Sequence, residues 1–227
     1  MRTKLKFRHE RKYCLTRADA AVVRGRVVRM LKPDANAAGP YHISSLYFDD
    51  AHDTALHEKL NGVFMRDKWR LRWYNGNFGF IRLERKQKRG DLACKEHAAV
   101  SEAQFRRLRA GDISCAAEGN EPVWRAFYAR HLLGVMRPVV TVEYDREAFS
   151  YAPGNVRITF DAGLRAAAPG SSCSVAVDTD GLIIMELKYD GFLPAVAAGL
   201  LSGMQFTQLA LSKYVMARRS LRCFGYE

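Results

Sequence analysis

Polar and apolar residues alternate along several stretches of this chain, most clearly in two runs between residues 66 and 97. In the first run every second residue is basic or polar, and the residues between are bulky and apolar. This period of two is typical of a β-strand with one buried face. The polar face holds Lys68, Arg70, Arg72 and Tyr74, and the apolar face holds Trp69, Leu71 and Trp73.

A turn rich in Asn and Gly at 75–79 leads into a second alternating run, so the two runs predict a β-hairpin. An isolated hairpin of this kind usually has one buried face and one face in water. Repetition of the pattern elsewhere in the chain favours a different arrangement. In the second run Arg82, Glu84, Lys86 and Lys88 face away from Ile81 and Leu83.

Further stretches rich in alternating or β-favouring residues bring the predicted number of strands to eight. They span residues 4–14, 41–50, 91–100, 138–149, 155–161 and 182–189.

Helical spacing and end signals predict helices between these strands. Thr16 begins one helix that Pro33 ends, and Ser101 with Gln104 begins another that Gly111 ends. Helices are also predicted at 52–60, at 121–135, and as two segments within 193–219 separated around Gly203, the second containing Leu209, Leu211, Tyr214 and Val215.

Charged residues alternate with apolar ones in five of the strands, and this decides the predicted fold. An eight-stranded antiparallel sheet can close on itself, with helices covering its apolar outer face and the charged face turned inward. We therefore expect an α+β fold: an eight-stranded antiparallel β-barrel tunnel with helices packed outside and a C-terminal helical segment. The charges are Arg8, Glu10, Lys12, Arg70, Arg72, Arg82, Glu84, Lys86, Arg157, Asp161, Glu186 and Lys188.

The overall charge and composition are consistent with a polyanion-binding interior. Residues 1–227 are 48% apolar, which predicts a single domain. The formal net charge of +12 indicates a polyanionic partner, because buried like charges cost several kcal/mol unless counter-ions accompany them.

The location of the protein is predicted from its cysteines and from its hydrophobic segments. Five scattered cysteines without a C-x-x-C pair favour a reducing cytosol, hence a cytoplasmic protein. No apolar run approaches the ~20 residues of a membrane span, and the first ten residues are too charged for a signal peptide.

Nine short motifs, taken together, are specific in their order. The motifs are Phe7-Arg8-x-Glu10-x-Lys12-Tyr13, Ser45-x-Tyr47-Phe48-Asp49, Arg70-x-Arg72-Trp73-Tyr74, Glu84-x-Lys86, Cys94-Lys95-Glu96, Tyr144-x-Arg146-x-Ala148-Phe149, Arg157-x-x-x-Asp161, Met185-Glu186-x-Lys188 and Ser212-Lys213-Tyr214. With these motifs in this order the chain resembles the triphosphate tunnel metalloenzymes (CYTH-like superfamily), in particular the polyphosphate polymerase (VTC) domain of the vacuolar transporter chaperone family.

The resemblance implies a set of phosphate-binding residues along the tunnel, with Lys95 near its mouth. Arg offers a planar fork that matches phosphate oxygens, and Lys a compact charge. The implied set is Lys12, Arg70, Arg72, Lys86, Lys95, Arg146, Arg157, Lys188 and Lys213; Lys12, Arg70, Arg72 and Lys86 also form the catalytic set with Glu186.

The resemblance also implies a divalent metal, Mn²⁺ or Mg²⁺, on Glu186, with Glu10 and Glu84 as further candidates. Internal salt bridges are the alternative for Glu10 and Glu84, and an ion pair with Lys188 is the alternative for Glu186. One departure from the family pattern is Ala210, where the polymerase carries a second basic residue before the position of Lys213.

The activity implied is ATP-dependent polyphosphate synthesis, with ATP or another nucleoside triphosphate and polyphosphate as partners. A tunnel triphosphatase and a non-catalytic receptor for polyphosphate or inositol phosphates are alternatives. No membrane span is expected, so export of product would require a membrane-protein partner.

Nucleic acid is not an expected partner, although tryptophans stand beside arginines. Alternation places Trp69 and Trp73 opposite Arg70 and Arg72, where the rings cannot stack on bases that the arginines hold. The chain also lacks the Walker A, G-x-S-x-G and H-E-x-x-H motifs of other enzyme classes.

Overall fold

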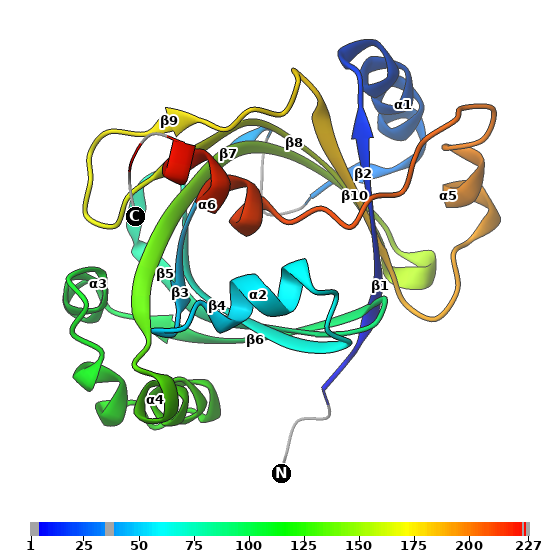
Figure 1. Ribbon diagram of the computed structural model, residues 1–227. Helices are drawn as coiled ribbons and strands as arrows, with labels where there is room; N and C mark the ends of the chain where they lie inside the picture. Colours follow the sequence, from blue (N-terminus) through cyan, green and yellow to red (C-terminus); the bar gives the residue numbers. More distant parts are fainter. Residues whose placement is uncertain (1–4, 35–38, 224, 226–227) are drawn as a thin grey trace.

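A ring of eight antiparallel strands forms the centre of the molecule in this computed structural model, which describes residues 5–34, 39–223 and 225 (Figure 1). Around the ring the strands follow the order β7, β3, β4, β5, β6, β1, β10 and β8, and β8 pairs again with β7. They are β1 (Arg8–Leu15), β3 (Tyr41–Asp49), β4 (Met65–Tyr74), β5 (Asn77–Arg89), β6 (Leu92–Val100), β7 (Arg137–Tyr151), β8 (Val156–Ala167) and β10 (Ile183–Tyr189).

All eight predicted strands are therefore present, and the expected mixed fold on a large antiparallel sheet is confirmed. The predicted start of the first strand at residue 4 lies outside the described residues. Two short strands that the sequence pattern did not predict, β2 (Lys32–Pro33) and β9 (Val175–Ala176), pair with β7 and β8.

The ring has one weakly paired seam, between β1 and β6. Only two residue pairs join these strands, Arg8 with Ala93 and His9 with Leu92, whereas seven pairs join β1 to β10. Further along β1 the backbone oxygen of Lys12 accepts a hydrogen bond from the amide of Leu209 at 2.9 Å. The later chain thus occupies this edge of β1, and the seam distinguishes the ring from the closed barrel predicted from sequence.

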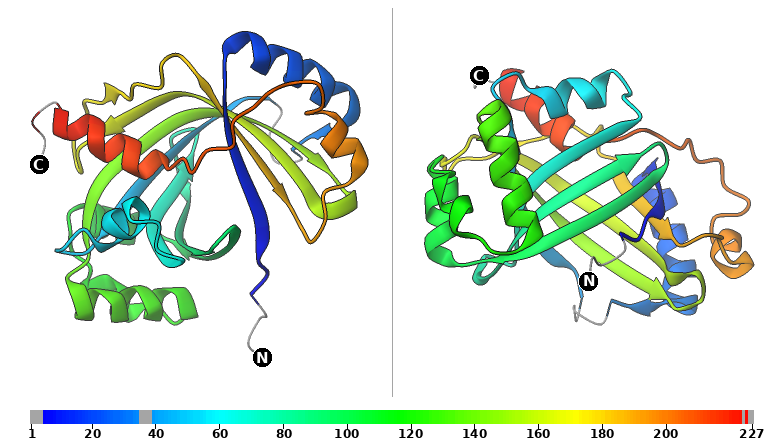
Figure 2. Two further views of the ribbon diagram at one scale, coloured as in Figure 1. Left: turned by 45° about the vertical axis from the view of Figure 1, so that its right-hand side comes forward. Right: turned by 90° about the horizontal axis from the view of Figure 1, so that it is seen from below.

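Helices cover the outside of the ring and one of its ends (Figures 1 and 2). The helices α1 and α5 pack beside β1, β8 and β10, and α3 and α4 pack on β4–β6. The helices α2 and α6 lie side by side at one end. Their bounds are α1 (Arg17–Met30), α2 (Thr54–Leu60), α3 (Glu102–Arg109), α4 (Pro122–Gly134), α5 (Ala195–Gly199) and α6 (Lys213–Cys223), with 3₁₀ turns at Ser114–Glu118 and Pro153–Asn155.

The central hairpin has the faces that alternation predicts. Trp69 and Trp73 of β4 are buried on the outer face, where their rings lie 5.2 Å from Phe127 and 5.1 Å from Phe105, measured between ring centroids. This aromatic packing fixes the strand's outward face against α3 and α4. The basic residues of β4 therefore point into the ring.

Helix starts follow the predicted capping residues. The Thr16 hydroxyl accepts a hydrogen bond from the amide of Asp19 at 3.1 Å, and Ser101 with Gln104 forms a reciprocal capping box. Each arrangement satisfies backbone donors that the first helical turn leaves free.

The predicted helix containing Leu209 and Leu211 is wrong in its first half. Gln208 and Leu209 are extended and pair with β1, and α6 begins only at Lys213. The Ser212 hydroxyl accepts a hydrogen bond from the amide of Val215 at 3.4 Å and so caps the helix. Pairing with a strand distant in sequence outweighs the local helical spacing here.

Within the described residues, no helix combines the length and hydrophobicity needed to cross a bilayer.

Candidate functional site

The interior of the ring contains a basic cavity. At its centre is a space of about 70 Å³, and eight of the thirteen residues that line it are Lys or Arg. Spaces of about 250 and 270 Å³ adjoin it, and Lys86 lines all three. We call the three spaces together the basic cavity; it extends from residues 208–212 at one end to Arg8, Tyr41 and Arg157 at the other.

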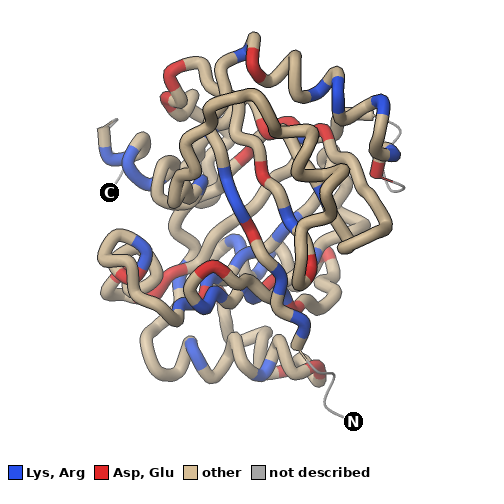
Figure 3. The backbone as a smooth tube through the Cα atoms, turned by 90° about the vertical axis from the view of Figure 1, so that its right-hand side faces the viewer, with Lys and Arg blue, Asp and Glu red and all other residues tan. Residues whose placement is uncertain are grey.

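Acidic residues are interspersed with the basic ones along the strands (Figure 3). Antiparallel register places opposite charges directly across from one another: Arg70 of β4 faces Glu84 of β5, and Lys12 of β1 faces Glu186 of β10. Cross-strand pairs of opposite charge stabilise a sheet. The cavity is therefore a network of ion pairs with an excess of cations.

Glu84 is the most deeply buried carboxylate of this network, with no exposed surface. Its oxygens lie 2.6 Å from an Arg70 nitrogen and 2.7 Å from Lys95 Nζ, and Arg72 lies 3.9 Å away. Burial opposes ionisation, but the three cations outweigh it and hold the pKa of Glu84 well below its usual range. Glu84 is thus a stable anion that holds these three cations in place.

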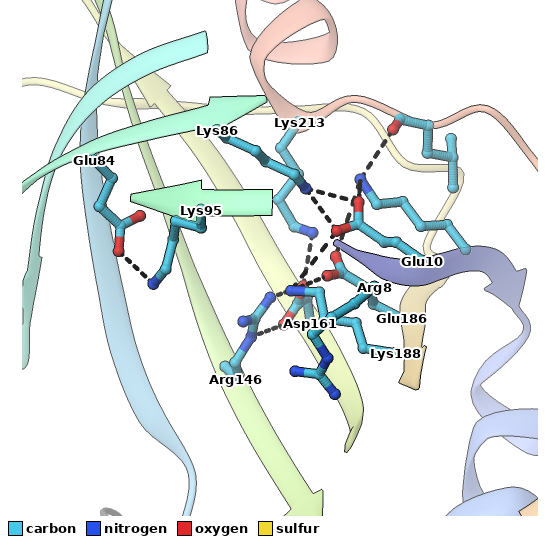
Figure 4. Close-up of polar contacts among 12 residues, drawn as sticks. Arg8, Glu10, Glu84, Lys86, Lys95, Arg146, Asp161, Glu186, Lys188 and Lys213 are labelled. Carbon is cyan, nitrogen blue, oxygen red and sulfur yellow. Dashed lines mark hydrogen bonds and ion pairs between the residues drawn. The ribbon is translucent and has the colours of Figure 1, made fainter. Parts of the chain in front are cut away.

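A second group of charges joins β1, β5 and β10 (Figure 4). Lys86 Nζ lies 2.7 Å from Glu10, and Lys188 Nζ lies 2.5 Å from Glu186. Lys12 lies between the two carboxylates, 3.4 Å from Glu10 and 3.9 Å from Glu186. Burial opposes ionisation of Glu186 as well, yet Lys188, Lys12 and Lys86 lower its pKa well below the usual range.

The third group centres on Asp161 of β8. The guanidinium of Arg146 donates to both of its oxygens, at 2.6 and 2.7 Å, and Lys213 Nζ lies 2.6 Å away. The sequence pattern placed Asp161 on a charged face but did not identify it as the partner of Arg146 and Lys213. Register between β7 and β8 and the approach of α6 bring the three together.

Lys213 is positioned by the start of α6, which a buried hydrogen-bond network attaches to α2. The Tyr214 hydroxyl donates to Asp49 at 2.5 Å, and Arg218 contacts Asp53 at 2.6 Å. Asp49 also accepts hydrogen bonds from amides at the start of α2, including that of Ala55 at 2.9 Å. The network fixes the end of α6 that faces the cavity.

The structure brings together the phosphate-binding residues implied by the resemblance. Seven line the central space, and Lys95 and Arg157 line the adjoining space at one end; Arg157 pairs with Asp34 at 2.5 Å. Each of the nine has an acidic partner, so they are not the mutually repelling cations that the sequence suggested. The central seven are Lys12, Arg70, Arg72, Lys86, Arg146, Lys188 and Lys213.

Further lining residues were not selected from the sequence. The Tyr47 hydroxyl accepts from Arg70 at 2.9 Å, and the Tyr144 hydroxyl accepts from Arg72 at 3.2 Å. Lys68, on the face of β4 that carries Arg70, also lines the cavity. Alternation placed Lys68 on this face, but no motif distinguished it from a solvated lysine.

The carboxylates of the cavity differ in how well they fit a divalent metal. No group of three or more His, Cys, Asp or Glu side chains in the described residues could hold a metal ion. Mg²⁺ is commonly bound by one or two carboxylates together with substrate phosphates. Glu10 and Glu186, which share Lys12, fit an ion that arrives with a triphosphate, whereas Glu84 is enclosed by Arg70 and Lys95.

Comparison with known proteins identifies one matching family and several similar folds. A sequence profile for the VTC domain matches residues 7–222. A Bacillus halodurans protein provisionally described as an adenylate cyclase is 11% identical, with 99% of this chain and 93% of that chain covered and a TM-score of 0.50. This likeness shows that the two chains share a fold.

Two other solved structures match with lower scores. A Pyrococcus horikoshii protein is 11% identical, with 94% of this chain and 99% of that chain covered and a TM-score of 0.47. A Vibrio parahaemolyticus protein, also provisionally described as an adenylate cyclase, is 13% identical over 87% of this chain and 86% of its own, with a TM-score of 0.47. No curated protein sequence shows a significant match.

Proposed function

Because this chain belongs to the VTC domain family, we propose that it transfers phosphoryl groups in the basic cavity and extends polyphosphate from ATP or another nucleoside triphosphate. The observation that carries the proposal is the central space, where eight basic residues surround about 70 Å³. A small space lined by so many cations suits a linear phosphate chain, because Arg and Lys both bind phosphate oxygens.

Phosphoryl transfer depends on positioning and on stabilising negative charge, rather than on a covalent side-chain nucleophile. We propose that Arg70 and Arg72 hold triphosphate oxygens through their planar guanidinium groups, oriented by Tyr47 and Tyr144. A terminal oxygen of the polyphosphate chain would attack the γ-phosphorus. The bond from the γ-phosphorus to its bridging oxygen breaks, and the electron pair leaves with the nucleoside diphosphate.

The remaining cations would exchange partners when substrate binds. Lys12, Lys188 and Lys213 pair with carboxylates in the structure, so a phosphate must compete with Glu10, Glu186 and Asp161 for them. This pairing keeps the lysines ordered before the ligand arrives. Mn²⁺ or Mg²⁺ held by Glu186, with Glu10, would neutralise charge on the phosphate oxygens.

The test is to incubate purified protein with ATP labelled at the γ-phosphate and Mn²⁺, and to separate polymer, free phosphate and nucleoside diphosphate. Labelled polymer with stoichiometric diphosphate supports the proposal. Free phosphate alone would identify a triphosphatase, in which water replaces the polymer end. Tight polyphosphate binding with neither product would identify a receptor.

A further inference from the structure

Lys68 differs from the other seven cations of the central space in what surrounds it. It projects from β4 and lines both the central space of about 70 Å³ and the outer space of about 250 Å³. A group at the junction of these spaces can contact a chain that continues from one into the other.

Among the described residues, Lys68 has no carboxylate within ion-pair distance. Its Nζ donates to the Ser212 hydroxyl at 2.6 Å and lies 5.1 Å from the centroid of the Tyr214 ring. Glu10 lines the same outer space, but its oxygens lie 2.7 Å from Lys86. Lys68 therefore lacks the anionic partner that each of the nine implied phosphate-binding residues has.

The charged groups around Lys68 make an anion there favourable. Its strongest charged neighbours are all cationic: Lys12 of β1, Lys59 of α2, Arg66 of β4 and Lys86 of β5. The acidic residues that line the same outer space are Glu10, which Lys86 pairs with, and Asp91. Burial first, and then the cationic neighbours, lower the pKa of Lys68 well below 10.5. A bound anion would offset both effects and raise that pKa, so binding would draw a proton from solution.

We propose that Lys68 and Ser212 form a phosphate-binding position additional to the nine implied by the resemblance, and that the ligand supplies the counter-charge Lys68 lacks. The inference rests on the proposed function, because it requires a phosphate chain in the basic cavity. Ser212 fits the role, since its hydroxyl can donate to a phosphate oxygen while the amide of Val215 donates to it.

The test compares Lys68→Met and Lys68→Arg with wild type by calorimetric titration of tripolyphosphate and of a non-hydrolysable ATP analogue. A lost charge-assisted contact predicts about tenfold to hundredfold weaker binding by Lys68→Met, and near wild-type binding by Lys68→Arg. Weakening with both ligands places a nucleotide phosphate at Lys68; weakening with tripolyphosphate alone places the polymer there.

The matched control is Lys88→Met, which removes one positive charge from the lining of the same outer space. Lys88→Met should weaken ligand binding less than Lys68→Met does. This smaller loss of affinity should vanish at high salt, because long-range charge interactions are screened. Titration at pH 8.5 in two buffers of different ionisation enthalpy should show more proton uptake by wild type than by Lys68→Met.

Wild-type affinity and proton uptake in Lys68→Met would overturn the inference. The proposed function would survive that result if Arg70→Ala still weakened binding, whereas unchanged affinity in both variants would remove the support for the cavity as a phosphate site.

Discussion

At the scale of single residues, the carboxylates of the basic cavity have two properties that can be measured separately. Each one holds neighbouring lysines or arginines, and Glu186 is also the residue proposed to hold a metal. The ion pair of Glu186 with Lys188 at 2.5 Å, which the sequence left as an alternative, is present in the structure. A carboxylate paired with lysine can change partners when a metal–triphosphate enters the cavity, so the ion pair is compatible with the proposed metal role.

Glu186→Gln should separate these roles. The amide keeps size and hydrogen bonding but loses the anionic ligand, so turnover should fall by at least tenfold, about 1.4 kcal/mol. Metal-free tripolyphosphate should bind as tightly as to wild type, or more tightly, because Lys188 and Lys12 lose a competing anion. Turnover assays at saturating Mn²⁺ and calorimetry without metal measure the two effects; equal loss of both would assign Glu186 a structural role.

Asp161 should govern part of the acid stability. Burial opposes its ionisation, but Arg146 and Lys213 outweigh it and lower its pKa below 3.8. A depressed carboxyl pKa stabilises the fold above the unfolded pKa near 4, and this stabilisation is lost as pH falls through the folded pKa. Asp161→Asn should therefore lower the unfolding free energy by about 3 kcal/mol at pH 7, and less below pH 4.

Urea unfolding from pH 7 to pH 2.5 measures this difference. The control is Asp145→Asn on β7, whose side chain is 66% exposed, so its ion pair contributes little. If the difference in unfolding free energy between wild type and Asp161→Asn stayed constant down to pH 2.5, the proposed contribution of ionised Asp161 to stability would be wrong.

At the scale of elements, the β4–β5 hairpin shows what an alternating sequence specifies. Trp69 and Leu71 are buried outside and Arg70 points inside, as the period of two requires. Alternation says which face a residue lies on, but not which residue of another strand it meets. The partners of Arg146 and Lys213 depend on register and on tertiary approach, and the sequence pattern did not identify them.

The C-terminal segment also shows that local sequence spacing does not identify tertiary partners. Spacing of Leu209, Leu211 and Tyr214 resembles a helix, yet Leu209 is extended because β1 offers an unpaired edge beyond the seam. The order of the motifs identified the nine cations because the motifs contain them. Lys68 belongs to none of these motifs, so only the three-dimensional structure reveals its place in the cavity.

Arg70→Ala should reveal the cost of breaking a cross-strand pair inside this hairpin. Tripolyphosphate affinity should fall by about 1 to 3 kcal/mol through the lost contact. The unfolding free energy should fall by about 3 kcal/mol, since Glu84 is left buried with fewer cations. Sequence reasoning alone, which treated the arginines as mutually repelling, would expect stability to hold or rise.

Calorimetry measures the change in tripolyphosphate affinity, and urea unfolding measures the change in unfolding free energy. Arg85→Ala is the matched control on the same hairpin: Arg85 pairs with the partly exposed Asp67 and does not line the central space, so both effects should stay below about 1 kcal/mol. An Arg70→Ala protein as stable as wild type would show that Glu84 does not depend on this partner.

At the scale of the whole molecule, filling the basic cavity should stabilise the fold. A ligand that binds only the folded state adds about 2.7 kcal/mol at a hundredfold excess over Kd. For a chain of this size that corresponds to a rise in Tm of about 5 to 10 °C. Tripolyphosphate should produce this shift in a thermal melt, and sulfate at equal ionic strength should produce much less; equal shifts would indicate general screening.

Under the proposed function, the seam between β1 and β6 has a consequence for how long a polymer product stays attached. A polyphosphate chain threaded through an unbroken ring of β-strands can leave only by sliding out end first. Each enzyme would then complete one long polymer before starting another. At the seam the ring is closed by two residue pairs between β1 and β6, Arg8 with Ala93 and His9 with Leu92. Processivity would then depend on how often these pairs open together with the Glu10–Lys86 ion pair and the bond from Leu209 to β1, and the length distribution of the product would record it.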